Sequence, residues 1–342
     1  MLGSPCARGQ SYFVKSITAG YRLEFGSRTA RRRGPTLPWT MNSPHPSAPT
    51  PLDADPASAQ HGYVGGQLRA HFEALFAEHA ARNAQALQQP GWLLDQAYGA
   101  HPRQTLDLLR GPGPRQGTLV YFHAGYWQSR DKSQFRFLAP AWLALGWDVA
   151  LVNYPLCPEV TVPDIVASAA LALQQVRAWQ AQHAQASGQT PGALVLCGHS
   201  AGGHLVTELA LQQASSSQAL PKAFGQPIAG VVAVSGVFDL RPLVHTSLNE
   251  RLGLDAASAQ AASPLLRVCA GAAPGLWLWG GAETPAFHAQ SLAMAERWRA
   301  QGNATQAHAV PDADHFTVLS TLTEREGVFA RQLPAWASTA RL

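Results

Sequence analysis

Short apolar runs alternate with helical patterns along most of the chain. The apolar runs are five to seven residues long, which is the length of strands, and glycine or proline flanks them. Between them, apolar residues recur every three or four positions, as on one face of a helix. Alternation of this kind over more than 200 residues predicts the α/β class, with a mostly parallel sheet and helices on both faces. The strands are expected at 104–109, 117–122, 147–152, 193–197, 228–234, 274–279 and 306–310, and the helices at about 132–145, 162–185, 201–214, 285–301 and 324–338.

Two segments interrupt this alternation. Residues 239–265 lie between two strands and read as loop and short helices, so we expect a small cap or pocket segment there. Residues 41–60 are rich in Pro, Ser and Ala without apolar periodicity, whereas an amphipathic helical pattern runs from 66 to 87. We therefore expect residues 1–60 to be a disordered or non-native extension, and residues 61–342 to be one folded domain.

The positive charge is confined to the first part of the chain. The net charge is +4, but residues 1–40 hold seven basic side chains and one acidic one, and the remaining residues hold 18 basic and 20 acidic side chains. A nucleic-acid-binding fold keeps its positive charge on the folded surface. The folded part is therefore not expected to bind nucleic acid, and a binder that uses residues 1–40 would lose its affinity when they are deleted.

The remaining bulk features indicate a cytoplasmic protein without metal or cofactor. The four cysteines are scattered and form no CxxC pair, so neither a zinc site nor a disulfide framework is indicated. The longest apolar stretch, 138–152, is broken by Gly146 and Asp148 and is shorter than a membrane span. The arginines at 31–33 are not followed by the apolar region of a secretion signal. The sequence is compatible with a homodimer but does not indicate one.

The strongest chemical motif is Gly198-His199-Ser200-Ala201-Gly202. It follows the apolar run 194–197 directly, and a helical pattern follows it. A serine between a strand and a helix, with glycines on both sides, is typical of a nucleophile on a strained turn. Ser200 is therefore the expected nucleophile. His199 is expected to be a pocket wall or a structural partner rather than a base.

A second motif, from Tyr121 to Trp127, ends an earlier strand. A serine nucleophile that attacks a carbonyl needs N–H donors placed for the oxyanion that forms. We expect these donors to be the backbone N–H groups of Gly125, Tyr126 and Ala201, the last at the start of the helix. His123 is expected to brace this loop.

A serine hydroxyl also needs a base, and the base needs an orienting acid. The expected chain order is serine, acid, histidine. His315 follows the last strand directly, whereas His308 lies within that strand and His288 within a helix, so His315 is the expected base.

The acid is expected after the strand that ends at 279. The first acidic residue there is Glu283, and Asp239, after the preceding strand, is the alternative. Asp312 and Asp314 are too close in sequence to point at the His315 ring and are expected to shape its loop.

These residues resemble the kynurenine formamidase (arylformamidase) branch of the α/β-hydrolases, which lies near the hormone-sensitive-lipase type of esterase. That branch carries an oxyanion loop of the form HGGxW and a nucleophile segment GHSAGGHL. Here the first reads His123-Ala124-Gly125-Tyr126-Trp127, and the second is complete from Gly198 to Leu205. The similarity extends over about residues 65–340, through 128–132, 153–158, 246–249 and 281–285. Two positions depart from the pattern: Ala124 replaces a glycine, and the acid position is Glu283 where vertebrate-like members carry Asp.

The resemblance implies an α/β-hydrolase catalytic domain with the triad Ser200, Glu283 and His315. It implies hydrolysis of a small acyl amide, such as the N-formyl arylamine N-formylkynurenine, through an acyl-enzyme and without a metal. Hydrolysis of small carboxylic esters is the alternative, and a non-catalytic ligand-binding homologue is a further one. The substrate pocket is expected to include Trp127, His199 and Asn249.

Overall fold

The computed structural model of the chain describes residues 55–113, 115–216 and 227–339. They belong to one compact unit, Pro49–Leu342. The expectations for residues 1–54 lie outside the described residues. Within the described ranges, no helix is both long and apolar enough to cross a membrane.

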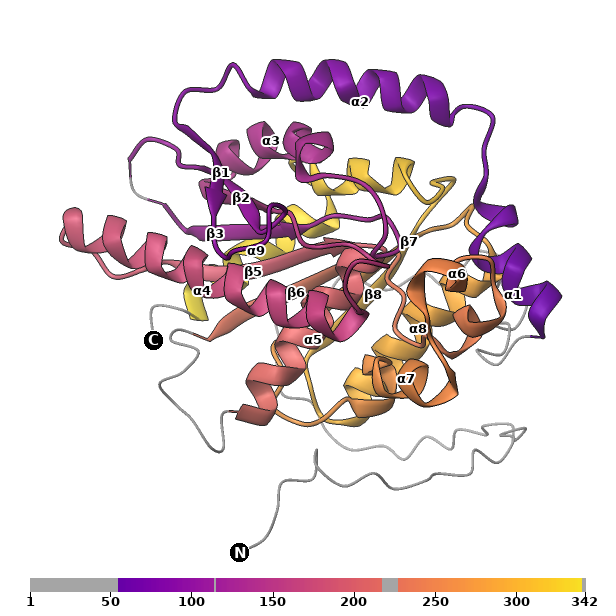
Figure 1. Cartoon of the computed structure of the whole chain (residues 1–342). Coiled ribbons are helices and arrows are strands. Elements are labelled where there is room, and N and C mark those ends of the chain that lie inside the picture. Colours follow the sequence, from indigo (N-terminus) through magenta and orange to yellow (C-terminus); the bar gives the residue numbers. More distant parts are fainter. Residues whose placement is uncertain (1–54, 114, 217–226, 340–342) are drawn as a thin grey trace, which may run out of the picture. The chain divides into compact units, whose positions relative to one another are not determined.

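Eight strands form one sheet in the order β1-β2-β4-β3-β5-β6-β7-β8 (Figure 1). The first two pairings, β1 with β2 and β2 with β4, are antiparallel, and every pairing from β4 to β8 is parallel. The predicted α/β class with a mostly parallel sheet is thus confirmed. The strands are β1 (Trp92–Ala97), β2 (Thr105–Leu109), β3 (Gly117–Phe122), β4 (Trp147–Val152), β5 (Ala193–His199), β6 (Ile228–Val234), β7 (Gly275–Gly280) and β8 (Thr305–Val310).

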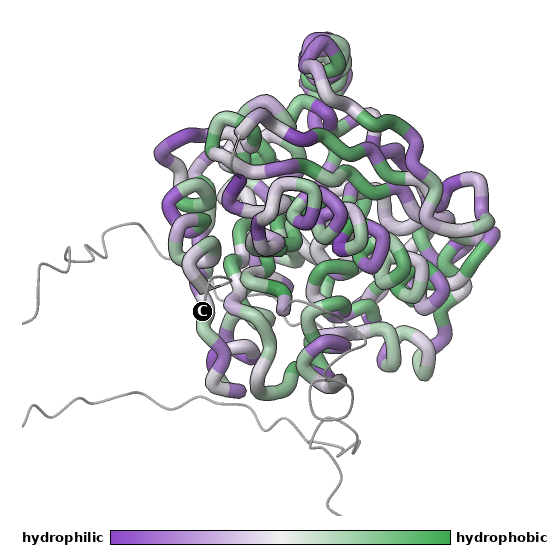
Figure 2. Tube along the Cα trace, turned by 90° about the vertical axis from the view of Figure 1, so that its left-hand side faces the viewer, coloured by the Kyte–Doolittle hydropathy of each residue, from purple (hydrophilic) through white to green (hydrophobic). Residues whose placement is uncertain are grey.

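Helices cover both faces of the sheet. One face packs into a continuous apolar cluster with the segment 135–142 and with the region 318–337. The opposite face contacts the helices that follow β5 and β7. Figure 2 shows apolar stretches along the strands, as expected for a sheet buried on both sides. The α-helices are α1 (Pro56–Tyr63), α2 (Phe72–Ala86), α3 (Ala139–Ala144), α4 (Val162–Ala186), α5 (Ala201–Ser216), α6 (Asn249–Leu252), α7 (Ala256–Ala261), α8 (Pro285–Ala300) and α9 (Val328–Thr339).

Short 3₁₀ helices fill several connections. The segment 239–265 contains α6 and α7 between two of these turns, in agreement with the expectation of loop and short helices. The 3₁₀ helices are η2 (Gly65–Gln67), η3 (Lys132–Leu138), η4 (Arg241–His245), η5 (Pro264–Arg267) and η6 (Thr317–Leu322).

The structure corrects the sequence analysis at the N-terminal side of the domain. Residues 56–60, expected to be part of a disordered extension, form the start of α1, because Asp55 accepts hydrogen bonds from the N–H groups of Ala57 and Ser58 as an N-cap. Strand β1 was missed, since it lies at the sheet edge with mostly exposed side chains and has no strand pattern. The helical pattern of 66–87 becomes a helix only from Phe72.

The topology gathers the loops that carry the motifs. Strands β3, β5, β6, β7 and β8 are parallel, so the segments that follow their carboxyl ends meet at one edge of the sheet. This edge is where α/β proteins place their ligands. The candidate nucleophile, acid and base all follow strands that end there.

Candidate active site

Ser200 lies at the junction of β5 and α5 in a strained conformation. Its φ is +56°, a region that residues other than glycine rarely occupy, and its side chain is buried. Its N–H donates to the carbonyl of Val234 at the end of β6 (2.8 Å), and its own carbonyl accepts from the N–H of His204 (3.2 Å). Backbone hydrogen bonds on both sides therefore hold the strained serine in place.

The two glycines beside Ser200 are required by close backbone contacts. A Cβ at Gly198 would lie 2.1 Å from the carbonyl oxygen of Gly202, and a Cβ at Gly202 would lie 1.9 Å from the carbonyl oxygen of Phe122. Because Gly198 has no side chain, the chain can make the tight turn. Because Gly202 has none, the start of α5 packs directly against the end of β3, from which the oxyanion loop leaves.

The predicted base and acid are neighbours. The Nδ1 atom of His315 lies 3.4 Å from Oε1 of Glu283, and both side chains are buried. The same Glu283 oxygen accepts hydrogen bonds from the hydroxyl of Ser235 (2.5 Å) and the N–H of Gly280 (3.4 Å). The carboxylate is thus fixed from two sides and faces the imidazole. Ser235 was missed in the sequence, although it directly follows β6 at the same edge of the sheet.

The loop of His315 is held by its neighbours. Asp314 accepts hydrogen bonds from the N–H groups of Phe316 and Thr317, and its other oxygen lies 2.7 Å from Nε2 of His71. Burial raises the pKa of Asp314, but these backbone hydrogen bonds outweigh it and bring the pKa below its ordinary value. Asp314 is therefore ionised and shapes the loop, as expected from the sequence.

Asp239, the alternative acid, is engaged elsewhere. Its carboxylate is fully buried and forms two hydrogen bonds with the guanidinium of Arg241, at 2.8 and 2.6 Å. It also accepts from the N–H of Arg241. This pairing supports Glu283 rather than Asp239 as the partner of His315.

The oxyanion loop has an irregular backbone. Gly125, Tyr126 and Trp127 have φ values of +129°, +48° and +58°. A Cβ at Gly125 would lie 2.2 Å from the carbonyl oxygen of Ser129, so this position requires glycine. The Tyr126 hydroxyl donates to the carbonyl of Tyr63, at the end of α1. These contacts hold the loop in its conformation. The loop leaves β3 beside the start of α5 at Ala201.

His123 braces the loop in the way that the sequence analysis expected. Its ring stacks on Tyr154 at a centroid distance of 4.3 Å, and its Nδ1 atom hydrogen-bonds the carbonyl of Ala124. The Tyr154 hydroxyl donates to the carbonyl of His123 itself (2.7 Å). Burial lowers the pKa of His123 to about 4, so the ring is neutral near pH 7. His123 is therefore a structural support of the oxyanion loop.

A buried ion network anchors the chain after this loop. Asp107 of β2 is fully buried between Lys132 (2.9 Å) and Arg136 (2.7 Å), the first of which is also nearly fully buried. The side chain of Asn153 accepts from the N–H of Lys132 and donates to Asp131. These ion pairs and hydrogen bonds together fix the path of residues 131–136. Asp131 and Lys132, which belong to the similar stretch 128–132, therefore have a structural role.

The three predicted pocket residues have different surroundings. The side chain of Asn249 donates to the carbonyls of Val244 and Leu254 and accepts from the N–H of Leu254. Its polar atoms therefore brace the segment 239–265, and its contact with substrate stays a prediction. Trp127 is fully buried, with its ring edge-to-face against His204 at 5.0 Å.

His199 lies against the candidate base. The two ring centroids are 4.7 Å apart, and His199 is fully buried. Burial and the neighbouring His315 ring lower the pKa of His199 well below its ordinary value. His199 is therefore a neutral wall beside His315, and its contact with substrate stays a prediction.

The segment from α1 to α2 contributes contacts that the sequence did not indicate. The Tyr63 hydroxyl accepts from Gln290 (2.7 Å), and its ring packs against Phe287, whose ring lies 4.5 Å from that of His315. Gln67 donates to the hydroxyl of Thr284, next to the candidate acid. This N-terminal segment therefore supports the oxyanion loop, the acid loop and the base loop together.

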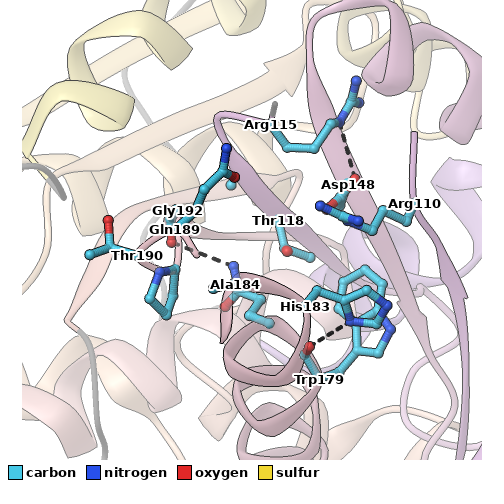
Figure 3. A pocket seen from close by; sticks show the side chains of 13 residues that line it. Arg110, Arg115, Thr118, Asp148, Trp179, His183, Ala184, Gln189, Thr190 and Gly192 are labelled. Carbon is cyan, nitrogen blue, oxygen red and sulfur yellow. Dashed lines mark hydrogen bonds and ion pairs between the residues drawn. The ribbon is translucent and has the colours of Figure 1, made fainter. Parts of the chain in front are cut away.

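One cavity lies away from these residues. It has a volume of about 40 Å³ and is lined by residues at the amino ends of β3 and β4, such as Gly117, Thr118 and Asp148 (Figure 3). Arg115 donates to Asp148 across it (3.1 Å). It lies at the edge of the sheet opposite Ser200, so it takes no part in the site. Among the described residues, no cluster of His, Cys, Asp or Glu has the arrangement of a metal site.

The chain is similar to several known proteins. A family model described as the alpha/beta hydrolase fold matches residues 119–319. A kynurenine formamidase of Danio rerio is 28% identical over 273 residues, which cover 78% of this chain and 87% of the relative. An esterase, LipQ, of Mycobacterium tuberculosis is 28% identical over 253 residues, covering 68% of this chain and 59% of the relative.

A solved structure extends the similarity. The crystal structure of a candidate thioesterase from Silicibacter sp. TM1040 is 34% identical, covers 82% of this chain and 98% of its own, and superimposes with a TM-score of 0.66. An esterase of Pyrobaculum calidifontis is 18% identical with a TM-score of 0.59, covering 84% of this chain and 94% of its own, and shares the fold.

Proposed function

The chain belongs to the α/β-hydrolase fold family, and from this premise we propose that it is a serine hydrolase that cleaves a small acyl amide through an acyl-enzyme on Ser200. Its relatives place it among hydrolases that act on amide or ester bonds. The observation that carries the proposal is the arrangement of His315 against Glu283 at the edge where Ser200 stands on its strained turn.

The proposed reaction uses the side chains in sequence. His315 accepts the hydroxyl proton of Ser200 as Oγ attacks the carbonyl carbon, and Glu283 stabilises the imidazolium that forms. The backbone N–H groups of Gly125, Tyr126 and Ala201 are the proposed donors to the oxyanion. When the tetrahedral intermediate collapses, His315 protonates the leaving amine. Water, deprotonated by His315, then attacks the acyl-enzyme. His315 returns this proton to Oγ of Ser200 as the carboxylic acid leaves, which regenerates the free hydroxyl.

The proposed substrate class is an N-formyl arylamine such as N-formylkynurenine. Relatives named kynurenine formamidase, from two fishes and a fly, support this class. The aromatic rings around the base, Phe287 and Phe316, are suited to an aryl leaving group. Small carboxylic esters are the second candidate class, because an esterase is among the relatives and a solved esterase structure shares the fold.

We extend the proposed catalytic domain toward the N-terminus. The sequence analysis began it at residue 61, but α1 begins at Pro56 and its last residue contacts the oxyanion loop. The domain therefore includes α1 and runs through α9.

A fluorophosphonate probe and a hydrolysis screen test the proposal. The wild-type protein is expected to be labelled at Ser200 and to hydrolyse N-formylkynurenine, formanilide or p-nitrophenyl acetate. Ser200→Ala is expected to lose labelling and several orders of magnitude in turnover, since nucleophile and base act as a unit. Full activity of a well-folded Ser200→Ala protein would exclude the mechanism. A wild-type protein that binds these molecules without hydrolysing them would instead be a non-catalytic homologue.

A further inference from the structure

Arg130 extends from the far end of the oxyanion loop to the aromatic wall of the candidate site. Its Cγ atom would lie 3.0 Å from a Cβ placed on Gly125, so its aliphatic stem covers the glycine of the oxyanion loop. Its guanidinium lies over two rings, 4.3 Å from the centroid of Phe76 and 4.8 Å from that of Phe316. The Phe316 ring in turn packs edge-to-face on His315. One aromatic ring therefore separates this guanidinium from the candidate base.

No carboxylate balances the charge of Arg130. Within the described ranges, no Asp or Glu lies at ion-pair distance from its guanidinium, whereas Arg103, Arg115 and Arg136 each have an acidic partner. The side chain is half-buried. Burial lowers the pKa of Arg130 below its ordinary value, and the neighbouring Tyr121 hydroxyl offsets this only in part. Burying part of a guanidinium without a counter-charge costs free energy, and a bound anion would offset this cost.

The groups around Arg130 favour a planar anion. The guanidinium carbon lies over both phenyl rings, which are perpendicular to each other. The N–H groups of a guanidinium lie in its plane, which is the geometry that receives both oxygens of a carboxylate. The nearby histidines do not compete as cations. Burial lowers the pKa of both His79 and His199, which are therefore neutral near pH 7.

The backbone at this position is strained. Arg130 has a φ of +74°, where glycine would be free of strain. A long cationic side chain here costs conformational energy that a glycine would avoid. This observation is independent of the missing counter-charge, and both point to a use for the guanidinium.

We propose that Arg130 is a specificity-determining residue that binds a carboxylate group of the substrate while its acyl amide or ester bond lies at Ser200. The inference rests on the proposed function for the reaction at Ser200, and it narrows the substrate to aromatic amides or esters that carry a carboxylate. The aryl part packs on Phe316, and the carboxylate pairs with the guanidinium.

Binding and hydrolysis of matched compounds test this inference. The pair consists of a formanilide with a carboxylate on its ring and the same formanilide with a carboxamide in place of the carboxylate. For the wild-type protein we expect kcat/KM to be higher for the carboxylate. In Arg130→Gln, which keeps the stem, this preference should fall about tenfold or more, chiefly through KM, because a charge-assisted hydrogen-bonded pair is lost. Arg130→Lys should restore part of the preference.

Arg82→Gln is the matched control. Arg82 also lies over a phenyl ring, that of Phe137 at 4.7 Å, but it pairs with Glu78, and the variant should keep the wild-type preference. Calorimetric titration of the Ser200→Ala protein with the two formanilides measures binding without hydrolysis. Equal binding of carboxylate and carboxamide, or an unchanged preference in a well-folded Arg130→Gln, would overturn the inference. Carboxylate-selective binding that depends on Arg130 would support it even if no substrate were hydrolysed, and in that case only the proposed reaction would fail.

Discussion

One carboxylate oxygen of Glu283 lies beside Nδ1 of His315. The same oxygen accepts hydrogen bonds from the hydroxyl of Ser235 and the N–H of Gly280. Replacing Glu283 by Gln keeps its size but offers His315 a neutral partner. The imidazolium then loses its stabilisation, so kcat should fall by about a hundredfold or more with little change in KM. Steady-state kinetics of Glu283→Gln beside Asp239→Asn measure this. If Glu283→Gln were fully active and a folded Asp239→Asn inactive, the acid would have to be reassigned.

At the same scale, local sequence signals were enough for the residues that carry the proposed chemistry. Ser200 directly follows β5, Glu283 lies three residues after the end of β7, and His315 lies five residues after the end of β8. The contacts that position these residues could not be predicted from local sequence. Tyr63 and Ser235 act through partners between 48 and 227 positions away, and neither lies in a motif. The hydrogen bonds of Asn249 to its own segment could likewise not be predicted from its neighbours in the sequence.

Among the elements, the ion network of β2 and η3 anchors the chain that follows the oxyanion loop. Asp107→Asn would leave the buried Lys132 without its buried counter-charge. We expect it to lower the free energy of unfolding by about 3–5 kcal/mol, since breaking a buried pair leaves an uncompensated charge. Asp95→Asn is the control, because Asp95 pairs with the same Lys132 from an exposed position and should cost about 1 kcal/mol or less. Urea unfolding of both variants compares them, and equal losses would contradict the prediction.

The elements themselves were predictable where burial is strong. The six strands from β2 to β7 are largely buried, and their apolar runs identify them. Strand β8 was predicted from its short apolar run although its side chains are half-exposed or exposed. Strand β1 pairs only through its backbone at the edge, and its Trp-Leu-Leu-Asp-Gln-Ala sequence gives no alternation. Helix α1 begins with a Pro after a capping Asp, but its eight residues are too few and too rich in alanine to show a periodic apolar face.

For the whole molecule, buried neutral histidines predict a loss of stability in mild acid. Burial lowers the pKa of His123 and of His204 to about 4 from an ordinary 6.5. Below pH 6.5 the unfolded chain binds protons that the folded chain refuses, so stability falls as the pH drops toward 4. Each group contributes up to about 1.4 kcal/mol per pH unit. Urea unfolding at pH 7 and pH 5 should show this decrease, and His204→Gln should reduce it. A flat profile would contradict it.

The N-terminal segment gives a further prediction at this scale. Deleting residues 1–40 should change neither the melting temperature nor kcat, because no apolar face in that stretch is expected to dock. Deleting residues 1–67 removes α1 and the contacts of Tyr63 and Gln67 with the oxyanion and acid loops. We expect that deletion to reduce kcat at least about tenfold, since the loops lose their support. Comparable kinetics of the two truncated proteins would show that α1 is dispensable.

The place of β8 in the sheet has a consequence for heat inactivation. The nucleophile follows β5, which has a parallel neighbour on each side, whereas the base follows β8, which is the last strand and is bonded only to β7 within the sheet. Its side chains are half-exposed or exposed. Edge segments open at lower free energy than central ones. On slow warming, amide exchange should therefore begin at β8 and the base loop, and the protein should lose turnover reversibly while Ser200 still stands on an intact turn.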